Sequence, residues 1–62
     1  MKWVLLGKRH INTNNVSYFK WDHGTLFVYF NVSEGSIVLP DPDKKLYRKM
    51  CKQQGIRPYE ED

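Results

Sequence analysis

Residues 16–39 read VSYFKWDHGTLFVYFNVSEGSIVL, and this stretch decides the fold class. Two short segments, Asp22-His23-Gly24 and Ser33-Glu34-Gly35, interrupt its apolar runs. Each contains a glycine, which supplies the positive φ that tight hairpin loops need. The stretch therefore predicts three consecutive antiparallel strands, at residues 16–21, 25–32 and 36–39.

The central predicted strand is apolar on both faces. Side chains of a strand point alternately to opposite faces of the sheet. One face of residues 25–32 carries Leu26, Val28, Phe30 and Val32, and the other carries Phe27 and Tyr29. Because one helix covers only one face of a small sheet, we expect the second face to meet a second copy of the chain, a partner or a nucleic acid.

The flanking residues extend this plan in both directions. Upstream, Trp3–Leu6 suits a first strand, residues 7–9 suit a turn, and a second short strand begins at His10. The asparagine-rich residues 12–15 are typical of a loop. Downstream, Pro40 ends the sheet, because proline cannot donate a hydrogen bond to a neighbouring strand.

A helix is predicted after the sheet. Asp41 suits the capping position, Pro42 the first helical position, and Asp43 the positive end of the helix dipole. The helix should cover residues 44–54 and end at Gly55. The fold expected is α+β: a small, twisted antiparallel β-meander of three to five strands with one C-terminal helix packed on one face.

The alternation also divides the side chains between two faces. The core face is expected to hold Val16, Tyr18, Leu26, Val28, Phe30, Ile37 and Leu39, covered by Leu46 and Met50. The opposite face is expected to show Phe19, Trp21, Phe27, Tyr29 and Val38. A shift of register by one residue would exchange the two sets.

The length and composition set further limits. Sixty-two residues form one small domain, here 1–59, followed by an acidic tail at 60–62. Such a domain is marginally stable alone. One cysteine, Cys51, excludes an internal disulfide, and one cysteine with two histidines does not match a zinc site. Self-association is the remaining way to stabilise so small a domain, so we expect a homodimer.

No targeting or membrane segment is evident from the pattern. The apolar run after Met1-Lys2 ends at Gly7, which is too short for a signal peptide core or a membrane span. A single cysteine fits a reducing compartment. We therefore expect a cytoplasmic protein with no membrane partner.

The opposite face suggests one binding function. Aromatic rings on a sheet can stack unpaired bases while nearby cations contact phosphates. Phe19, Trp21, Phe27 and Tyr29, with Lys20, match this pattern. The alternative is that the rings form a dimer interface or a second small core. Lys20 is the only clear cation within these strands, which counts against nucleic acid.

Basic residues elsewhere provide a second candidate. The net charge is +3, and the predicted helix carries Lys44, Lys45, Arg48, Lys49 and Lys52 beside an acidic tail. These cations, with Lys8 and Arg9 near the first turn, could contact phosphates. The alternative for the helix is an ordinary solvated face, and for the turn it is ordinary turn chemistry. The acidic tail could shield the basic helix.

The chain shows no constellation typical of an enzyme. His10 and His23 lack partners at a metal or catalytic spacing, and Cys51 lacks an acid–base partner. No catalytic residue, metal or cofactor is expected. The prediction is a non-catalytic binding module for single-stranded nucleic acid or DNA, and the alternative is a protein-interaction module, such as an adaptor or inhibitor of a larger protein.

The order of motifs in residues 9–50 resembles small bacterial β-meander-plus-helix proteins of unknown function. The likeness rests on Ile11-Asn12, Val16-Ser17-Tyr18, Gly24, the segments 26–30 and 35–39, and the helix start at Asp41. The same order is similar to the later part of LytTR-type DNA-binding domains, in which loops on a β-rich fold read DNA. This resemblance implies DNA binding, but the chain lacks the first half of such a domain.

Overall fold

The computed structural model of this chain describes residues 3–31 and 35–59, and it has the α+β fold expected from the sequence. The expected second hairpin loop and acidic tail fall partly or wholly outside these ranges. The elements in chain order are β1 (Trp3–Leu6), β2 (Arg9–Asn12), a 3-10 turn (Thr13–Asn15), β3 (Val16–Asp22), β4 (Thr25–Phe30), β5 (Ser36–Pro40) and α1 (Lys45–Gln54).

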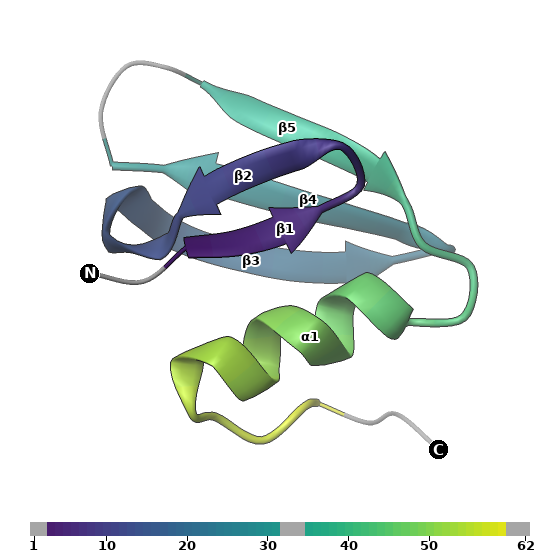
Figure 1. The fold of residues 1–62 in the computed structure, drawn as a ribbon. Helices are drawn as coiled ribbons and strands as arrows, with labels where there is room; N and C mark the ends of the chain where they lie inside the picture. The colour runs from purple at the N-terminus through teal and green to yellow at the C-terminus, as the bar shows by residue number, and fades with distance from the viewer. Residues whose placement is uncertain (1–2, 32–34, 60–62) are drawn as a thin grey trace.

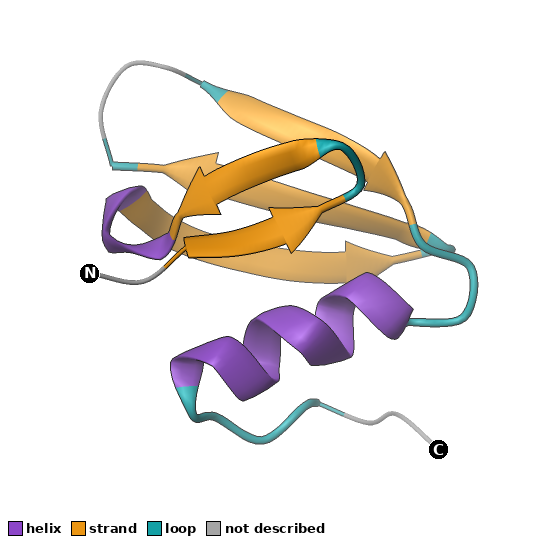
Figure 2. Ribbon diagram, viewed as in Figure 1, coloured by secondary structure: helices purple, strands orange, loops and turns teal. Residues whose placement is uncertain are grey.

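The strands form two antiparallel sheets rather than one continuous meander. The β1–β2 hairpin is a two-stranded sheet, and β3, β4 and β5 form a three-stranded sheet in that order. The hairpin and α1 both lie on the same side of the three-stranded sheet (Figure 1). Figure 2 shows the two groups of strands in orange with the helix beside them. The helix therefore shares the covering of this face with the hairpin, whereas the sequence predicted a helix alone.

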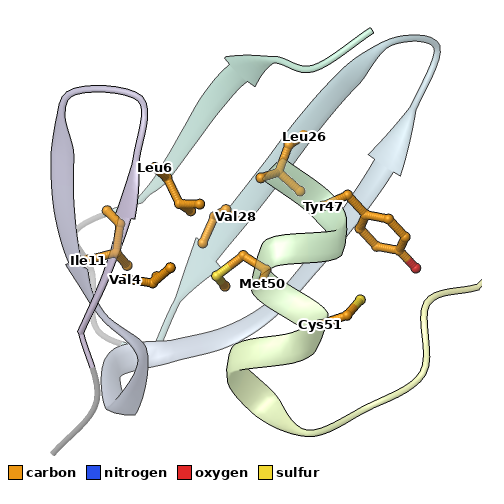
Figure 3. Packing of buried hydrophobic residues seen from close by; sticks show 8 residues of the cluster. All are labelled: Val4, Leu6, Ile11, Leu26, Val28, Tyr47, Met50 and Cys51. Carbon is orange, nitrogen blue, oxygen red and sulfur yellow. The ribbon is translucent and has the colours of Figure 1, made fainter. Parts of the chain in front are cut away.

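The core lies between the three-stranded sheet, the hairpin and the helix (Figure 3). Each of these parts contributes buried apolar side chains, and Leu6, Leu26, Val28 and Met50 are fully enclosed. The predicted core residues Leu26, Val28 and Met50 are confirmed. Five further residues are also buried, and the sequence interpretation did not place them in the core. Val4, Leu6 and Ile11 come from the hairpin, and Tyr47 and Cys51 come from α1.

A β-bulge in β3 corrects the predicted faces. Val16 pairs with Phe30, but the next pair is Tyr18 with Tyr29, so the register shifts at Ser17. An extra residue on one strand reverses the faces of all residues that follow it. The prediction was therefore wrong for Tyr18, which is exposed, and for Phe19 and Trp21, which pack against the core.

The β3–β4 connection is a two-residue hairpin turn. His23 and Gly24 both adopt positive φ, 49° and 74°, between the paired residues Asp22 and Thr25. This pattern is typical of the turns that match the twist of a hairpin. The predicted role of Gly24 is confirmed.

Asp41 fixes the start of α1 to the sheet. Its carboxylate accepts hydrogen bonds from the backbone N–H groups of Leu46 (2.9 Å) and Tyr47 (2.8 Å), as a capping side chain does, although Lys44 and not Asp41 occupies the N-cap position. Its backbone N–H donates to Gly24 O, and its carbonyl accepts from Trp21 Nε1 at 2.7 Å. The helix nevertheless begins at Lys45, so Pro42 is not its first residue.

The end of α1 returns the chain along the helix. Gly55 has φ 71°, its N–H donates to Lys52 O, and Ile56 N–H donates to Cys51 O. This pair of bonds is a Schellman motif, which glycine favours because it lacks a Cβ. The segment after Gly55 then passes beside α1 (Figure 1), where Tyr59 N–H donates to Tyr47 Oη at 2.8 Å.

Candidate functional site

The side of the three-stranded sheet away from the hairpin and helix is the first candidate surface. No other element in residues 3–31 and 35–59 covers it (Figure 1). The register places on this side alternate residues of all three strands. We call it the open face, and its principal side chains are Tyr18, Lys20, Phe27, Tyr29 and Val38.

The rings of the open face contact one another across strands. Tyr18 and Tyr29 are directly paired, and their rings stack with centroids 4.4 Å apart and planes 18° apart. The Lys20 ammonium lies 5.3 Å from the centroid of the Phe27 ring, within the range of a cation–π contact. These pairs leave Phe27 and Tyr29 half-buried, while Tyr18 and Val38 are each 56% exposed.

The charge of the open face is nearly balanced. Lys20 and Asp22 lie on the same side of β3, because they are two residues apart beyond the bulge. The Asp22 carboxylate is 2.8 Å from His23 Nδ1 in the adjacent turn. The open face is thus mainly aromatic, with one lysine and one aspartate at its β3 margin.

Three predicted site residues lie at the exposed edge of β3 instead of sharing one face. Phe19, Lys20 and Trp21 line a cleft of about 310 Å³ between β3, the start of α1 and the C-terminal segment. We call this the β3-edge cleft. Its remaining lining residues are Asp22, Lys44, Tyr47 and Tyr59.

Aromatic rings form much of the wall of the β3-edge cleft. The Phe19 and Tyr47 rings meet edge to face at a centroid distance of 5.9 Å. The Lys44 ammonium lies 4.7 Å from the Trp21 ring centroid. Lys20 belongs to both the cleft and the open face, so the two surfaces meet along β3.

The other predicted cations lie apart from the open face. Those of α1 are exposed on the solvent side of a helix that occupies the opposite side of the sheet (Figure 1). The hairpin cations Lys8 and Arg9 are exposed on that side too. Arg9 borders a second, shallow pocket of about 480 Å³ between β2 and the sheet. The α1 cations in question are Lys45, Arg48, Lys49 and Lys52.

Three residues of these surfaces were placed elsewhere, or given no binding role, by the sequence interpretation. Tyr18 was assigned to the core because strict alternation from Val16 points it inward. Lys44 was grouped with the helix cations rather than with the aromatic residues of β3, and Tyr59 was given no binding role. The sequence feature that could have indicated the bulge, and so the outward position of Tyr18, is the polar Ser17 between two larger residues. Serine is also common at exposed positions of a regular strand.

The described residues contain no group of three or more His, Cys, Asp or Glu side chains placed to hold a metal ion. Among the same residues, no helix has the length and apolar character needed to cross a membrane. No protein-family model matches the chain, and no curated protein or solved structure is significantly similar to it.

Proposed function

We propose that this chain is a non-catalytic binding module that binds single-stranded nucleic acid on the open face. The observation that carries the proposal is the uncovered sheet side, where Tyr18, Phe27 and Tyr29 gather beside Lys20. A π-face can stack on any base, and each stacked base contributes about 1–3 kcal/mol. Soluble monomers seldom leave such an aromatic surface without a binding role.

Cations near one margin of the open face support a strand rather than a duplex. Lys20 lies on the face itself, and Lys44 lines the adjoining β3-edge cleft, which Lys20 also lines. A flexible strand could stack bases on the rings and turn its phosphates toward these two ammonium groups. A rigid duplex keeps its bases paired and stacked internally, so it would reach the cations without using the rings.

A labelled single-stranded oligonucleotide tests this proposal by fluorescence anisotropy. Tyr18→Ser removes the most exposed ring of the face, so its effect on folding should be small. We expect its affinity to fall about fivefold or more, because one stacking contact is lost. The matched control is Leu5→Ser, which removes an exposed apolar side chain from the hairpin and should leave the affinity unchanged. Equal affinities for both variants and the parent protein would contradict the proposal.

Salt dependence provides a second measure of the same binding. With two or three phosphates contacted, affinity for a single strand should fall about sevenfold to about 20-fold between about 50 and 200 mM salt.

Trp21→Ala is unsuitable as a binding variant, because the Trp21 ring packs on the core and its indole N–H donates a hydrogen bond to Asp41 O.

A protein-interaction function is the second candidate. Two observations favour it. The Tyr18 and Tyr29 rings already stack on each other, which leaves less ring surface free for a base, and the opposite charges of Lys20 and Asp22 nearly cancel. Val38, exposed beside them, adds apolar area. The partner would be a larger protein or a second copy of this chain. In that case Tyr18→Ser would abolish association with the partner at both salt concentrations, and oligonucleotides would not bind.

A further inference from the structure

Lys44 has an unfavourable backbone conformation at the margin of the β3-edge cleft. Its φ and ψ are 62° and 19°, in the left-handed region that is costly for residues with a Cβ. Its N–H donates to Asp41 O at 3.2 Å, and its carbonyl accepts from Arg48 N–H at 2.9 Å. The surrounding hydrogen bonds therefore hold Lys44 in a conformation that glycine would adopt with less strain.

This conformation is accompanied by a specific side-chain position. The Lys44 ammonium lies over the Trp21 ring, 4.7 Å from its centroid, within the cleft. Backbone strain concentrates at binding sites because the binding role outweighs its cost. A lysine at a position that favours glycine thus points to a role for its positive charge.

The composition of the cleft indicates what that charge meets. Lys20 and Lys44 both line the cleft; the Lys44 ammonium lies over Trp21, and the Lys20 ammonium lies over Phe27 on the adjoining open face. The one carboxylate among the lining residues, Asp22, contacts His23 outside the cleft. This arrangement favours an anion over a cation.

Tyr59 adds an exposed aromatic ring to the lining of the cleft. Tyr59 is 70% exposed, and the hydrogen bond from its N–H to Tyr47 Oη holds its backbone beside the helix. The cleft volume of about 310 Å³ lies at the lower end of the range for small-molecule sites, about 300–1,000 Å³. A small ligand with one planar ring and one anionic group fits these features.

We propose that the β3-edge cleft binds a single nucleotide unit, with its phosphate between Lys20 and Lys44 and its base against Tyr59. The identification of the occupant as a nucleotide rests on the proposed function, since Lys20 joins this cleft to the open face. The unit is either a free mononucleotide or one nucleotide of a bound strand, and both present the same base and phosphate.

The test is a two-dimensional ¹⁵N NMR titration that monitors the Trp21 indole N–H and the Tyr59 amide. The probes are thymidine monophosphate, thymidine, inorganic phosphate and a short oligothymidylate. We expect both signals to shift with the monophosphate and the oligothymidylate, and to require higher concentrations of thymidine or phosphate alone. Saturation by the free monophosphate at concentrations similar to the strand would identify a mononucleotide site, and tighter binding of the strand would identify a strand subsite.

Lys44→Gly removes the ammonium while it relieves the backbone strain, so the variant should fold. We expect its affinity for the monophosphate to fall about fivefold to tenfold, the effect of one lost charged contact. Lys49→Ala is the matched control, because it removes one positive charge from the solvent side of the same helix. Its affinity should stay within about twofold of the parent protein.

The outcomes separate this proposal from the proposed function. Shifts confined to Tyr18, Phe27 and Tyr29 would overturn the cleft proposal and leave the open face as the binding surface. Shifts confined to the cleft would support it and overturn stacking on the open face. Equal losses in Lys44→Gly and Lys49→Ala, or equal affinity for inorganic phosphate and the monophosphate, would overturn the cleft proposal.

Discussion

Asp41 shows how one residue connects the sheet, the helix and the β3-edge cleft. It is 2% exposed, and its carboxylate, carbonyl and N–H all make hydrogen bonds to different segments. The capping role was predictable, because aspartate before a helix accepts from its first N–H groups. Its bonds to Trp21 and Gly24 were not, since they depend on residues that are distant in sequence.

Replacing Asp41 should destabilise the fold strongly. Asp41→Ala leaves the N–H groups of Leu46 and Tyr47 without their acceptor, and we expect a loss of about 2–3 kcal/mol in the free energy of unfolding. Asp41→Asn keeps one acceptor oxygen and should lose less. Urea unfolding followed by circular dichroism measures both.

The control for Asp41 is the nearby Asp43→Ala. The Asp43 carboxylate is exposed and accepts from Lys45 N–H at 3.2 Å, so its removal should change stability by about 0.5 kcal/mol. Similar losses at both positions would contradict the role assigned to Asp41.

Lys44 permits a separate test of backbone strain. We expect Lys44→Gly to be about 1 kcal/mol more stable than Lys44→Ala, because both variants lose the contact with Trp21 and only alanine keeps the cost of the left-handed conformation. The comparison uses thermal and urea unfolding of the two variants. Equal stabilities would show that the left-handed conformation is not maintained in solution.

At the scale of elements, the sequence predicted the strands and the helix better than the faces of β3. The turns at Gly7 and Gly24, the end of β5 at Pro40 and the end of α1 at Gly55 follow from local backbone preferences, so they could be predicted. A bulge depends on how two strands pair and has little local signature. Because the shift at Ser17 could not be foreseen, the prediction put Phe19 and Trp21 on the wrong face. These two residues are half of the candidate aromatic surface.

The bulge predicts unequal effects for two single-residue deletions in β3. Deleting Ser17 leaves Val16 opposite Phe30 and keeps Phe19 and Trp21 facing inward, so we expect a folded protein that loses about 1–2 kcal/mol. Deleting Lys20 instead would turn Trp21 toward the open face, and removing its ring from the core should cost about 3 kcal/mol or more.

Near-ultraviolet circular dichroism and urea unfolding distinguish the two deletions. A Ser17 deletion as damaging as the Lys20 deletion would argue against the register described for β3.

At the scale of the whole molecule, the hairpin and helix together cover one side of the sheet and leave the other open. The apolar side chains on both faces of β4 predicted that one helix would leave one side of the sheet uncovered. The positions of the cations could not be predicted in the same way, because they depend on how the hairpin and helix pack. The structure places Lys45, Arg48, Lys49 and Lys52 on the other side of the sheet from the open face, and Lys44 lines the β3-edge cleft together with Lys20.

The acidic residues 60–62 provide a test of long-range charge. They lie outside the described residues, but they follow Tyr59, which lines the β3-edge cleft. Removing these three carboxylates raises the net charge from +3 to +6. We expect oligonucleotide affinity to rise by about twofold to tenfold at low salt and the gain to shrink as salt screens the charges.

The control for this deletion neutralises the tail without shortening it, through Glu60→Gln, Glu61→Gln and Asp62→Asn. It should match the deletion in an anisotropy titration. Unchanged affinity in both forms would rule out a shielding role for the acidic residues.

Amide chemical-shift mapping can locate the bound strand and so test whether the open face binds single-stranded nucleic acid. A mixed-sequence single strand and the matching duplex would be titrated at low and at physiological salt. We predict single-strand shifts clustered at Tyr18, Lys20, Phe27 and Tyr29, weakened by salt, with much smaller shifts from the duplex. The absence of shifts on the open face with any oligonucleotide at low salt would contradict it.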